Sequence, residues 1–324
     1  MLTRSLLLSL GLGLIFVTAP AQVEAQDYPN REIKMVLGFP AGGSTDIQAR
    51  ILADKLSTVL GQRVVVENRG GANGATATRG VARSDKDGYT LAFNGTDLPI
   101  NLQGMREPGY SLDDFTIIGA FAYSPMVLIT TSKNSKAKSL KEFVDYAKAN
   151  PGKLSYATFG PQSIANLAAN RFKEQVGIDW REVPYKGAPQ IVQDMLNGTV
   201  DAYWGLTTVG SQLNGQPDIV LLGLADKKRN ERLPDVPTFV EQGLSQFVEF
   251  SATGLWVPAG TPKPIVDKLR KALADVRAMD DVKALLGKSG NAILDMTPEE
   301  YEKDVRNSSA RYGAEFKKLG IQPE

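Results

Sequence analysis

A glycine-rich turn between an apolar strand and a helix is the feature that most constrains how this chain folds. Residues 33–37 (IKMVL) form an apolar run that predicts a buried strand, and it leads directly into residues 38–46 (GFPAGGSTD). Residues 47–59 carry apolar side chains at helical spacing, and Thr45 followed by Gln48 predicts a capping box where that helix starts. The chain therefore begins with a strand, a tight turn and a helix.

The glycines of this turn suit it to bind an anion. Gly42 and Gly43 allow a sharp turn and leave no Cβ between the backbone and a ligand. The first amides of a helix have no partner inside the helix, and they point outward with the positive end of the macrodipole. This arrangement predicts an anion site made of backbone. The alternative is an ordinary strand-to-helix turn that needs glycine only for its conformation.

The same pattern returns in the middle of the chain. Residues 153–158 predict a strand, residues 159–163 (FGPQS) a turn, and residues 164–176 a helix with apolar side chains at helical spacing. Pro161 suits the first position of that helix, where its missing N–H costs nothing. Two such turns in two separate α/β units favour a ligand site between them over two ordinary turns.

The composition excludes several classes of function. The 324 residues suffice for about two domains, and a net charge of +1 without a basic stretch argues against nucleic acid as a partner. The absence of histidine removes the usual general base at neutral pH and most zinc sites, and the absence of cysteine removes disulfides. We therefore expect a binding protein without cofactor or metal, rather than an enzyme.

The first 25 residues have the pattern of a secretory signal peptide. Arg4 provides a short positive segment, residues 6–17 are apolar, and small residues follow at two alternative cleavage sites. A membrane anchor is the other interpretation, but the apolar run is short for one. We expect an exported, soluble protein whose mature chain starts near residue 22 or 26.

Two further strands complete the first unit. Residues 63–67 and 89–93 alternate with helical segments, which predicts a parallel sheet with right-handed crossovers. Ligands of such sheets lie beyond the carboxyl ends of the strands. The polar loop at residues 94–97 should therefore share an edge with the turn at residues 38–46. A second glycine-rich loop, residues 70–74, lacks the nucleotide-binding patterns and is interpreted as structural.

The remaining chain predicts a second lobe inserted into the first. Residues 115–121 and 126–131 are expected to form two strands, and the polar break at residues 132–138 marks a crossover. Residues 247–257 have the pattern of a long extended segment that returns to the first unit. The expected boundaries are a first lobe at 26–131, a second lobe at 132–248 and a return to the first lobe at 249–324.

Six short pieces of the chain, taken in order, carry a family resemblance. They are Tyr28-Pro29, residues 39–46 (FPAGGSTD), 66–71 (VENRGG), 87–91 (DGYTL), 183–187 (VPYKG) and 233–238 (LPDVPT). Each piece is weak alone, but the ordered series is specific and covers nearly all of the chain after residue 25. On these pieces the chain resembles the exported solute-binding proteins of tripartite tricarboxylate transporters, the Bug or TctC-like family.

The resemblance implies a type II periplasmic-binding-protein fold, an α/β architecture of two lobes around a ligand cleft joined by crossover strands. Members hold a ligand carboxylate through backbone amides and ordered waters at the first strand-to-helix loop, helped by the matching loop of the second lobe. The residues so implicated are Ala41, Gly42, Gly43, Thr45, Asp46, Gly160, Gln162 and Ser163. Gln162 replaces a glycine of the family pattern, and Asn166 stands near a usual histidine, so the Gln162 side chain is a candidate contact.

Residues at the ends of other predicted strands complete the candidate site. Aromatic side chains there either line the cleft for the body of a ligand or pack around the loops. The candidates are Phe39, Asn94, Thr96, Phe159, Trp204, Gly205 and Thr207, with Phe93 as a further aromatic strand end. Tyr185 and Lys186 are interpreted as a strand end with a solvated lysine, with a counter-charge for the ligand as the alternative.

A periplasmic receptor for an organic carboxylate is the function that we expect, with a dicarboxylate and an apolar or aromatic body favoured. The resemblance implies a monomer that passes its ligand to the membrane permease of a tripartite transporter. A receptor that docks on a signalling kinase is one alternative. An exported hydrolase or lyase using Asp46 with Lys186 or Tyr185 is the other, opposed by the missing histidine and nucleophile elbow.

Overall fold

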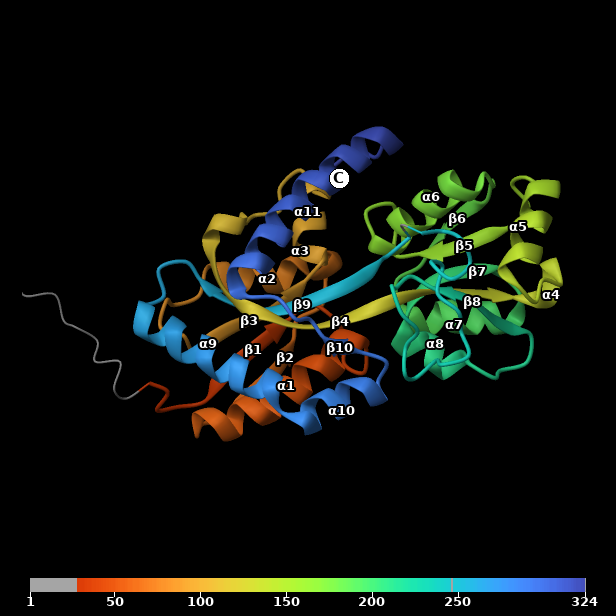
Figure 1. Ribbon diagram of the computed structural model, residues 1–324. Helices are drawn as coiled ribbons and strands as arrows, with labels where there is room; N and C mark the ends of the chain where they lie inside the picture. The colour runs from red at the N-terminus through yellow and green to blue at the C-terminus, as the bar shows by residue number, and fades with distance from the viewer. Residues whose placement is uncertain (1–27, 246, 324) are drawn as a thin grey trace, which may run out of the picture.

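The computed structural model describes residues 28–245 and 247–323, and it divides into two lobes that lie side by side (Figure 1). The predicted signal peptide, residues 1–25, lies outside the described residues. Two long strands, β4 (Phe115–Thr131) and β9 (Phe250–Pro258), run between the lobes. None of the helices in the described ranges is both long and apolar enough to cross a membrane.

The first lobe is built on a sheet whose three N-terminal strands are parallel, as predicted. The central strand of the three is β1, and β9 joins the edge of β3 in the antiparallel direction. A helix follows each parallel strand, because parallel neighbours need a crossover connection. The elements are β1 (Ile33–Leu37), α1 (Ser44–Leu60), β2 (Val64–Asn68), α2 (Ala75–Ala82), β3 (Thr90–Gly95) and α3 (Asp97–Gly104).

The second lobe has a sheet of its own. The central strand β5 pairs in parallel with β6 and β7, and the second part of β4 lies between β7 and β8. The predicted alternation of strands and helices is confirmed here. The elements are α4 (Ser132–Ser135), α5 (Leu140–Ala149), β5 (Ser155–Thr158), α6 (Ile164–Val176), β6 (Arg181–Pro184), α7 (Ala188–Asn197), β7 (Ala202–Leu206), α8 (Thr207–Leu213) and β8 (Ile219–Leu224).

After β9 the chain adds further elements to the first lobe. They are α9 (Lys263–Ala278), α10 (Asp280–Lys288), β10 (Ala292–Ile293) and α11 (Pro298–Leu319). A capping box starts α11: the Thr297 hydroxyl accepts from the N–H of Glu300, while the Glu300 carboxylate accepts from the N–H of Thr297. Pro298 occupies the first turn, where no N–H is needed.

One continuous strand replaces two that the sequence predicted. The 17 residues of β4 form an unbroken strand, whereas we expected one strand to end at residue 121 and another to begin at residue 126. Pro125 lies in the expected gap, and its lack of an N–H would be compatible with a break. Successive N–H groups of a strand point to opposite sides, and that of Met126 points toward the β9 side. On the other side, β10 pairs only up to Tyr123 and β7 only from Met126, so Pro125 deprives no partner of a donor.

The continuity of β4 makes it a member of both sheets. Residues up to Pro125 pair with β9, and residues from Met126 pair with β7 and, from Val127, with β8. The strand therefore passes from the first sheet to the second between Pro125 and Met126. The lobe boundaries expected from the sequence stay a prediction.

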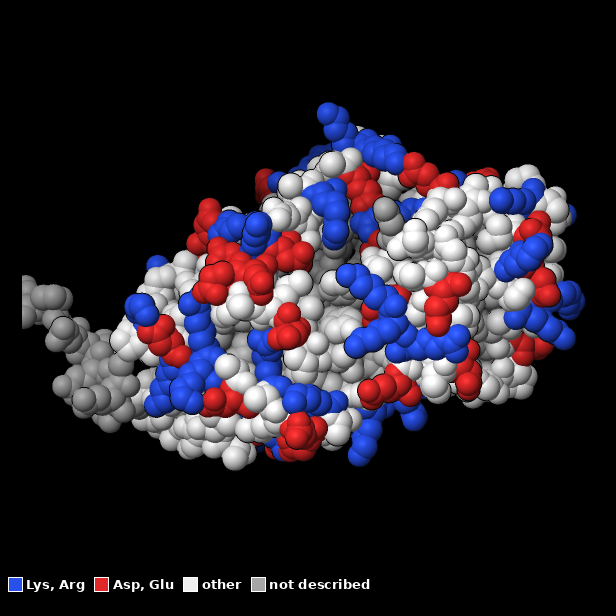
Figure 2. All heavy atoms as spheres, in the orientation of Figure 1, with Lys and Arg blue, Asp and Glu red and all other residues white. Residues whose placement is uncertain are grey.

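Each lobe encloses an apolar core. In the second lobe, four aromatic rings pack together with centroids 5.1 to 6.0 Å apart; they belong to Phe172, Trp204, Phe239 and Phe247. In the first lobe, side chains of β1 and α1 meet those of α9, including Met35, Leu52 and Leu269. On the face drawn in Figure 2, basic and acidic side chains are interspersed over both lobes.

Candidate functional site

The first predicted loop does form the start of α1, but without the capping box that the sequence suggested. Gly43 is the N-cap in an extended conformation, with φ −77° and ψ 169°, and no side chain caps the helix. The expected role of Thr45 and Gln48 as a capping box is therefore wrong. The reason is that Gln48 is buried and turned inward, where its amide donates to Asn291 over 2.8 Å.

Residues 41–43 are exposed, and the space in front of their backbone is open. A Cβ built on Gly42 would meet nothing within 4 Å, and one on Gly43 only the carbonyl oxygen of Pro40 at 3.6 Å. Gly42 has φ +85°, a conformation that favours glycine. This loop can therefore bring the amides at the start of α1 close to a ligand.

Asp46 holds this loop in place. Its carboxylate accepts hydrogen bonds from the N–H of Gly42 at 2.9 Å, from Asn68 at 2.9 Å and from Arg50 at 2.9 Å. Burial alone would raise the pKa of Asp46, but the hydrogen bonds from Arg50, Gly42 and Asn68 outweigh it and hold that pKa below its usual range. The carboxylate thus stays ionised, and it acts on the loop backbone.

The second predicted loop forms the start of α6. Ser163 is its N-cap: the hydroxyl accepts from the N–H of Asn166 at 3.3 Å and donates to the carbonyl oxygen of Gly160 at 2.7 Å. The sequence predicted Pro161 at the first helical position. This is wrong, because the helix begins only at Ile164 and Pro161 precedes the cap. Gly160 has φ +102° and open space around its Cβ position.

Each of the two loops adjoins the opposite lobe. The hydroxyl of Thr208, on α8, donates to that of Ser44, the first residue of α1, over 3.2 Å. The side chain of Gln162 contacts the backbone at Gly104, where a Cβ would lie 2.8 Å from it, and donates to Gln322 over 3.4 Å. The structure therefore brings both loops to the junction of the lobes.

Most residues in the contacts between α1, the segment after α10 and the second lobe were not predicted; the exception is Thr207, one of the candidate strand-end residues. The carboxamide oxygen of Asn291 accepts from Ser44 at 3.0 Å and from Gln48 at 2.8 Å, and Thr207 donates to the carbonyl oxygen of Gly290 over 2.6 Å. These partners lie far apart in the sequence and carry no motif. A sequence signal was absent, because single hydroxyls and amides are common in loops and helices alike.

Several candidate strand-end residues use their side chains inside the fold. Asn94 belongs to β3, not to a loop, and its amide donates to Thr78. The Thr96 hydroxyl accepts from the N–H of Ala252. The Trp204 side chain is 1% exposed in the aromatic core, so it follows the packing alternative. A Cβ on Gly205 would collide with Tyr203 and Ile129, and Phe93 is buried.

The aromatic residues of the two loops differ in exposure. Phe159 is 43% exposed, and its ring lies nearly perpendicular to that of Tyr203, so part of this aromatic side chain is open to solvent. Phe39 is half-buried and packs against the core of the first lobe. The Tyr185 hydroxyl donates to Asp194 over 2.8 Å, while Lys186 is exposed, which agrees with a structural strand end.

The two loops offer backbone N–H groups, and no basic side chain, to an anion. Neither residues 38–46 nor residues 159–163 contain Arg or Lys, so a bound anion would rest on backbone N–H groups at two helix starts. Within the part of the chain that the structure describes, no three acidic side chains gather to hold a metal ion. Of the acidic residues near the loops, Asp46 has its carboxylate engaged by three donors.

Comparisons with known proteins agree on one family. Residues 48–321 match the TctC model, described as "Tripartite tricarboxylate transporter family receptor". The periplasmic binding protein BugD is similar in structure, with a TM-score of 0.81 and 33% identity over 92% of this chain and 100% of that one. Rpa4515 of R. palustris, solved with adipate, has a TM-score of 0.84 and 29% identity over 92% and 100%.

A further solved structure extends the comparison to a second ligand. MatC (Rpa3494) from Rhodopseudomonas palustris, with bound malate, has a TM-score of 0.77 and 27% identity, covering 89% of this chain and 99% of that one. These likenesses confirm the expected fold, that of periplasmic solute-binding proteins of the Bug and TctC type. The chain therefore belongs to the TctC family of tripartite tricarboxylate transporter receptors.

Proposed function

We propose that this protein is a periplasmic receptor that captures an organic carboxylate between its lobes and delivers it to the membrane permease of a tripartite tricarboxylate-type transporter. One observation carries the proposal: an exposed, glycine-lined helix start at residues 41–43, whose next residue, Ser44, contacts the opposite lobe. Two solved relatives hold adipate and malate, both dicarboxylates, which supports this ligand class.

The carboxylate would be held by backbone rather than by a charged side chain. The amides of residues 43–45 would face one oxygen pair, with the positive end of the α1 dipole behind them, while the N–H of Gly42 stays bonded to Asp46. Gly160 and Gln162, on the second lobe, would complete the site from the other side. Phe159, which is 43% exposed, would contact the apolar body of the ligand. Closure of the lobes around the ligand would then exclude water.

The export route completes the proposal. Residues 1–25 would act as a signal peptide, and the mature monomer would work in the periplasm. A receptor that docks on a signalling kinase would use the same pocket, and a transport assay in a strain lacking the gene separates the two roles. An enzyme is disfavoured, because Asp46 is committed to its loop and the Tyr185 hydroxyl to Asp194.

Calorimetric titration with matched ligands tests the proposed function. Adipate and malate serve as probes, each beside its dimethyl ester, which has no free carboxylate, and beside a neutral sugar. We expect binding of at least one diacid without turnover, and binding at least tenfold weaker for the ester, about 1.4 kcal/mol. Equal affinity for acid and ester, or a preference for the sugar, would refute a carboxylate site.

A further inference from the structure

Helix α11 bridges the two lobes. Its first half packs on the first lobe, where Tyr301 and Val305 belong to the apolar cluster around Trp256. Its second half reaches the second lobe, where Tyr312 and Phe316 share a buried cluster with Leu167 of α6. In Figure 1 the carboxyl-terminal part of this helix extends from the first lobe toward α6. One rigid helix therefore contacts both bodies.

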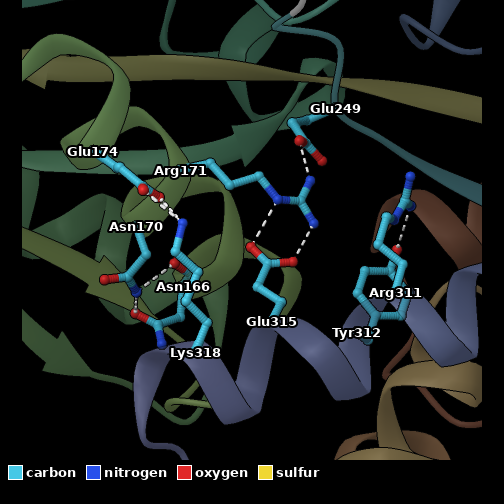
Figure 3. Close-up of polar contacts among 9 residues, drawn as sticks. All are labelled: Asn166, Asn170, Arg171, Glu174, Glu249, Arg311, Tyr312, Glu315 and Lys318. Atoms are coloured by element: carbon cyan, nitrogen blue, oxygen red, sulfur yellow. Dashed lines mark hydrogen bonds and ion pairs between the residues drawn. The ribbon is translucent and has the colours of Figure 1, made fainter.

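A single arginine connects three segments at this bridge. Arg171 of α6 makes two parallel hydrogen bonds to Glu315 of α11, at 2.7 and 2.6 Å, and its remaining nitrogen pairs with Glu249 (Figure 3). Glu249 directly precedes β9, one of the two strands that link the lobes. The guanidinium thus ties α6 both to α11 and to the link between the lobes.

This cluster is largely withdrawn from solvent. The side chains of Arg171, Glu249 and Glu315 are 25%, 12% and 13% exposed. Burial raises the pKa of Glu249 even with the arginine beside it. A second ion pair between the same helices, Lys318 with Glu174, is by contrast 62% exposed on both sides. Exposed pairs contribute little, whereas removing one partner of a buried pair leaves an uncompensated charge.

Helix α6, which carries Arg171, also follows directly on the second ligand loop, residues 159–163. One turn before Arg171, Asn166 donates to the carbonyl oxygen of Pro161 over 2.8 Å, and Asn170 donates to Asn166 over 2.9 Å. Beyond α11, the chain reaches this loop directly through the contact between Gln322 and Gln162. Any rotation of α6 relative to α11 would therefore move the loop relative to the first lobe.

We propose that Arg171, Glu249 and Glu315 form an inter-lobe latch that holds the lobes in the arrangement seen here. The latch stabilises this arrangement only, so it sets the share of receptors in which the two ligand loops are placed as seen here. The link from latch to ligand affinity rests on the proposed function, whereas the link from latch to lobe arrangement does not.

Spin-label distances in the empty protein test the latch without any ligand. The chain contains no cysteine, so Ala284→Cys on α10 and Gln190→Cys on α7, both exposed, give one label on each lobe. Glu315→Gln removes the negative charge of the carboxylate that accepts two hydrogen bonds from Arg171. Arg171→Met removes the shared partner and leaves two buried carboxylates. Glu174→Gln, at the exposed pair of the same interface, is the matched control.

We expect Glu315→Gln to raise the share of longer inter-lobe distances about fivefold or more, and Arg171→Met to raise it further, while Glu174→Gln leaves the distribution unchanged. Circular dichroism checks that each variant is folded, and Glu315→Gln serves alone if Arg171→Met is not. Unchanged distances in the folded latch variants, or an equal change in the control, would overturn the proposal. Titration with adipate and malate then tests affinity separately. If the latch variants open but neither they nor the parent protein bind a diacid, only the proposed ligand is refuted.

Discussion

The hydroxyl of Thr208 donates to the hydroxyl of Ser44 over 3.2 Å, and these residues are 164 positions apart in the chain. Ser44 begins α1 immediately after the exposed glycines, so the contact fixes the first ligand loop against the second lobe. On the far side of the junction, Arg171 and Glu315 tie α6 to α11. The positions of the two ligand loops therefore depend on contacts between the lobes, at Ser44 with Thr208 and at Arg171 with Glu315.

Gly43→Asp should abolish binding of diacids without weakening the fold. The residue has φ −77°, and a Cβ there meets only Pro40 at 3.6 Å, so aspartate fits. Aspartate is also a favoured N-cap, but it places a negative charge where the ligand carboxylate is expected. Titration with adipate and malate checks affinity, and thermal melting checks the fold.

The matched control for that variant is Gly187→Asp. Gly187 is likewise a glycine N-cap in an extended conformation, at the start of α7. The Gly187→Asp variant should bind diacids with the same affinity as the parent protein. If Gly43→Asp keeps its affinity while remaining folded, the carboxylate lies elsewhere, and Lys186 becomes the next candidate.

Ser163→Ala should lower the unfolding free energy, and it should affect ligand affinity only indirectly. The sequence left Ser163 as a candidate donor to the ligand, but its hydroxyl donates to Gly160 and caps α6. Loss of such a cap costs about 0.5–2 kcal/mol of unfolding free energy. Ser139→Ala removes the equivalent cap of α5 and should cost a similar amount. Urea unfolding measures both, and only Ser163→Ala should also alter diacid affinity, through its loop.

Asp46→Asn should loosen the first loop. The amide group turns one acceptor into a donor, which then faces the N–H of Gly42 and Arg50 or the amide of Asn68. We expect a loss of about 1–3 kcal/mol in unfolding free energy. Because the folded pKa of Asp46 lies below its usual value, this stability is fully present above about pH 4 and is lost as the pH falls. Asp54→Asn, on the exposed face of α1, is the control in urea unfolding.

The local pattern of the chain predicted both ligand loops but not their capping. Residues 33–37 and 155–158 form strands, and helices follow at Ser44 and Ile164, because apolar spacing and turn residues act over short distances. The assignment of the cap to Thr45 failed, because burial of Gln48 against Asn291 depends on a contact 243 residues away. Local propensity carries no information about such a partner.

The continuity of β4 and the burial of Trp204 are of the same kind. Pro125 breaks a strand only if its missing N–H faces a neighbour, and that depends on where β7 and β10 end. Trp204 lies near the predicted end of a strand, at the expected edge of the cleft. Whether its ring faces the cleft or the core depends on its packing against Phe172 and Phe247. In both cases the deciding residues lie on other elements.

The last prediction concerns Asp97, the first residue of α3. Its Oδ2 is buried without a hydrogen-bond partner, and Gly74 packs closely enough that a Cβ there would lie 3.0 Å from this atom. Burial raises the pKa of Asp97 to about 7, although the N–H groups of Asp97 and Gly95 partly offset it. The folded protein thus keeps a proton that the unfolded chain releases near pH 4.

The sign of the effect follows from that difference in proton binding. The stability contributed by protonated Asp97 is fully present below about pH 4 and is lost as the pH rises through about 7. Asp97→Asn cannot ionise, so its unfolding free energy should gain steadily on that of the parent between these pH values and run parallel above them. Urea unfolding from pH 4 to pH 8 measures this, with Asp85→Asn, an exposed residue, as the control for the substitution itself. A constant difference between parent and Asp97→Asn across the whole range would show that the carboxyl is ionised in the folded protein, and that a donor reaches its Oδ2.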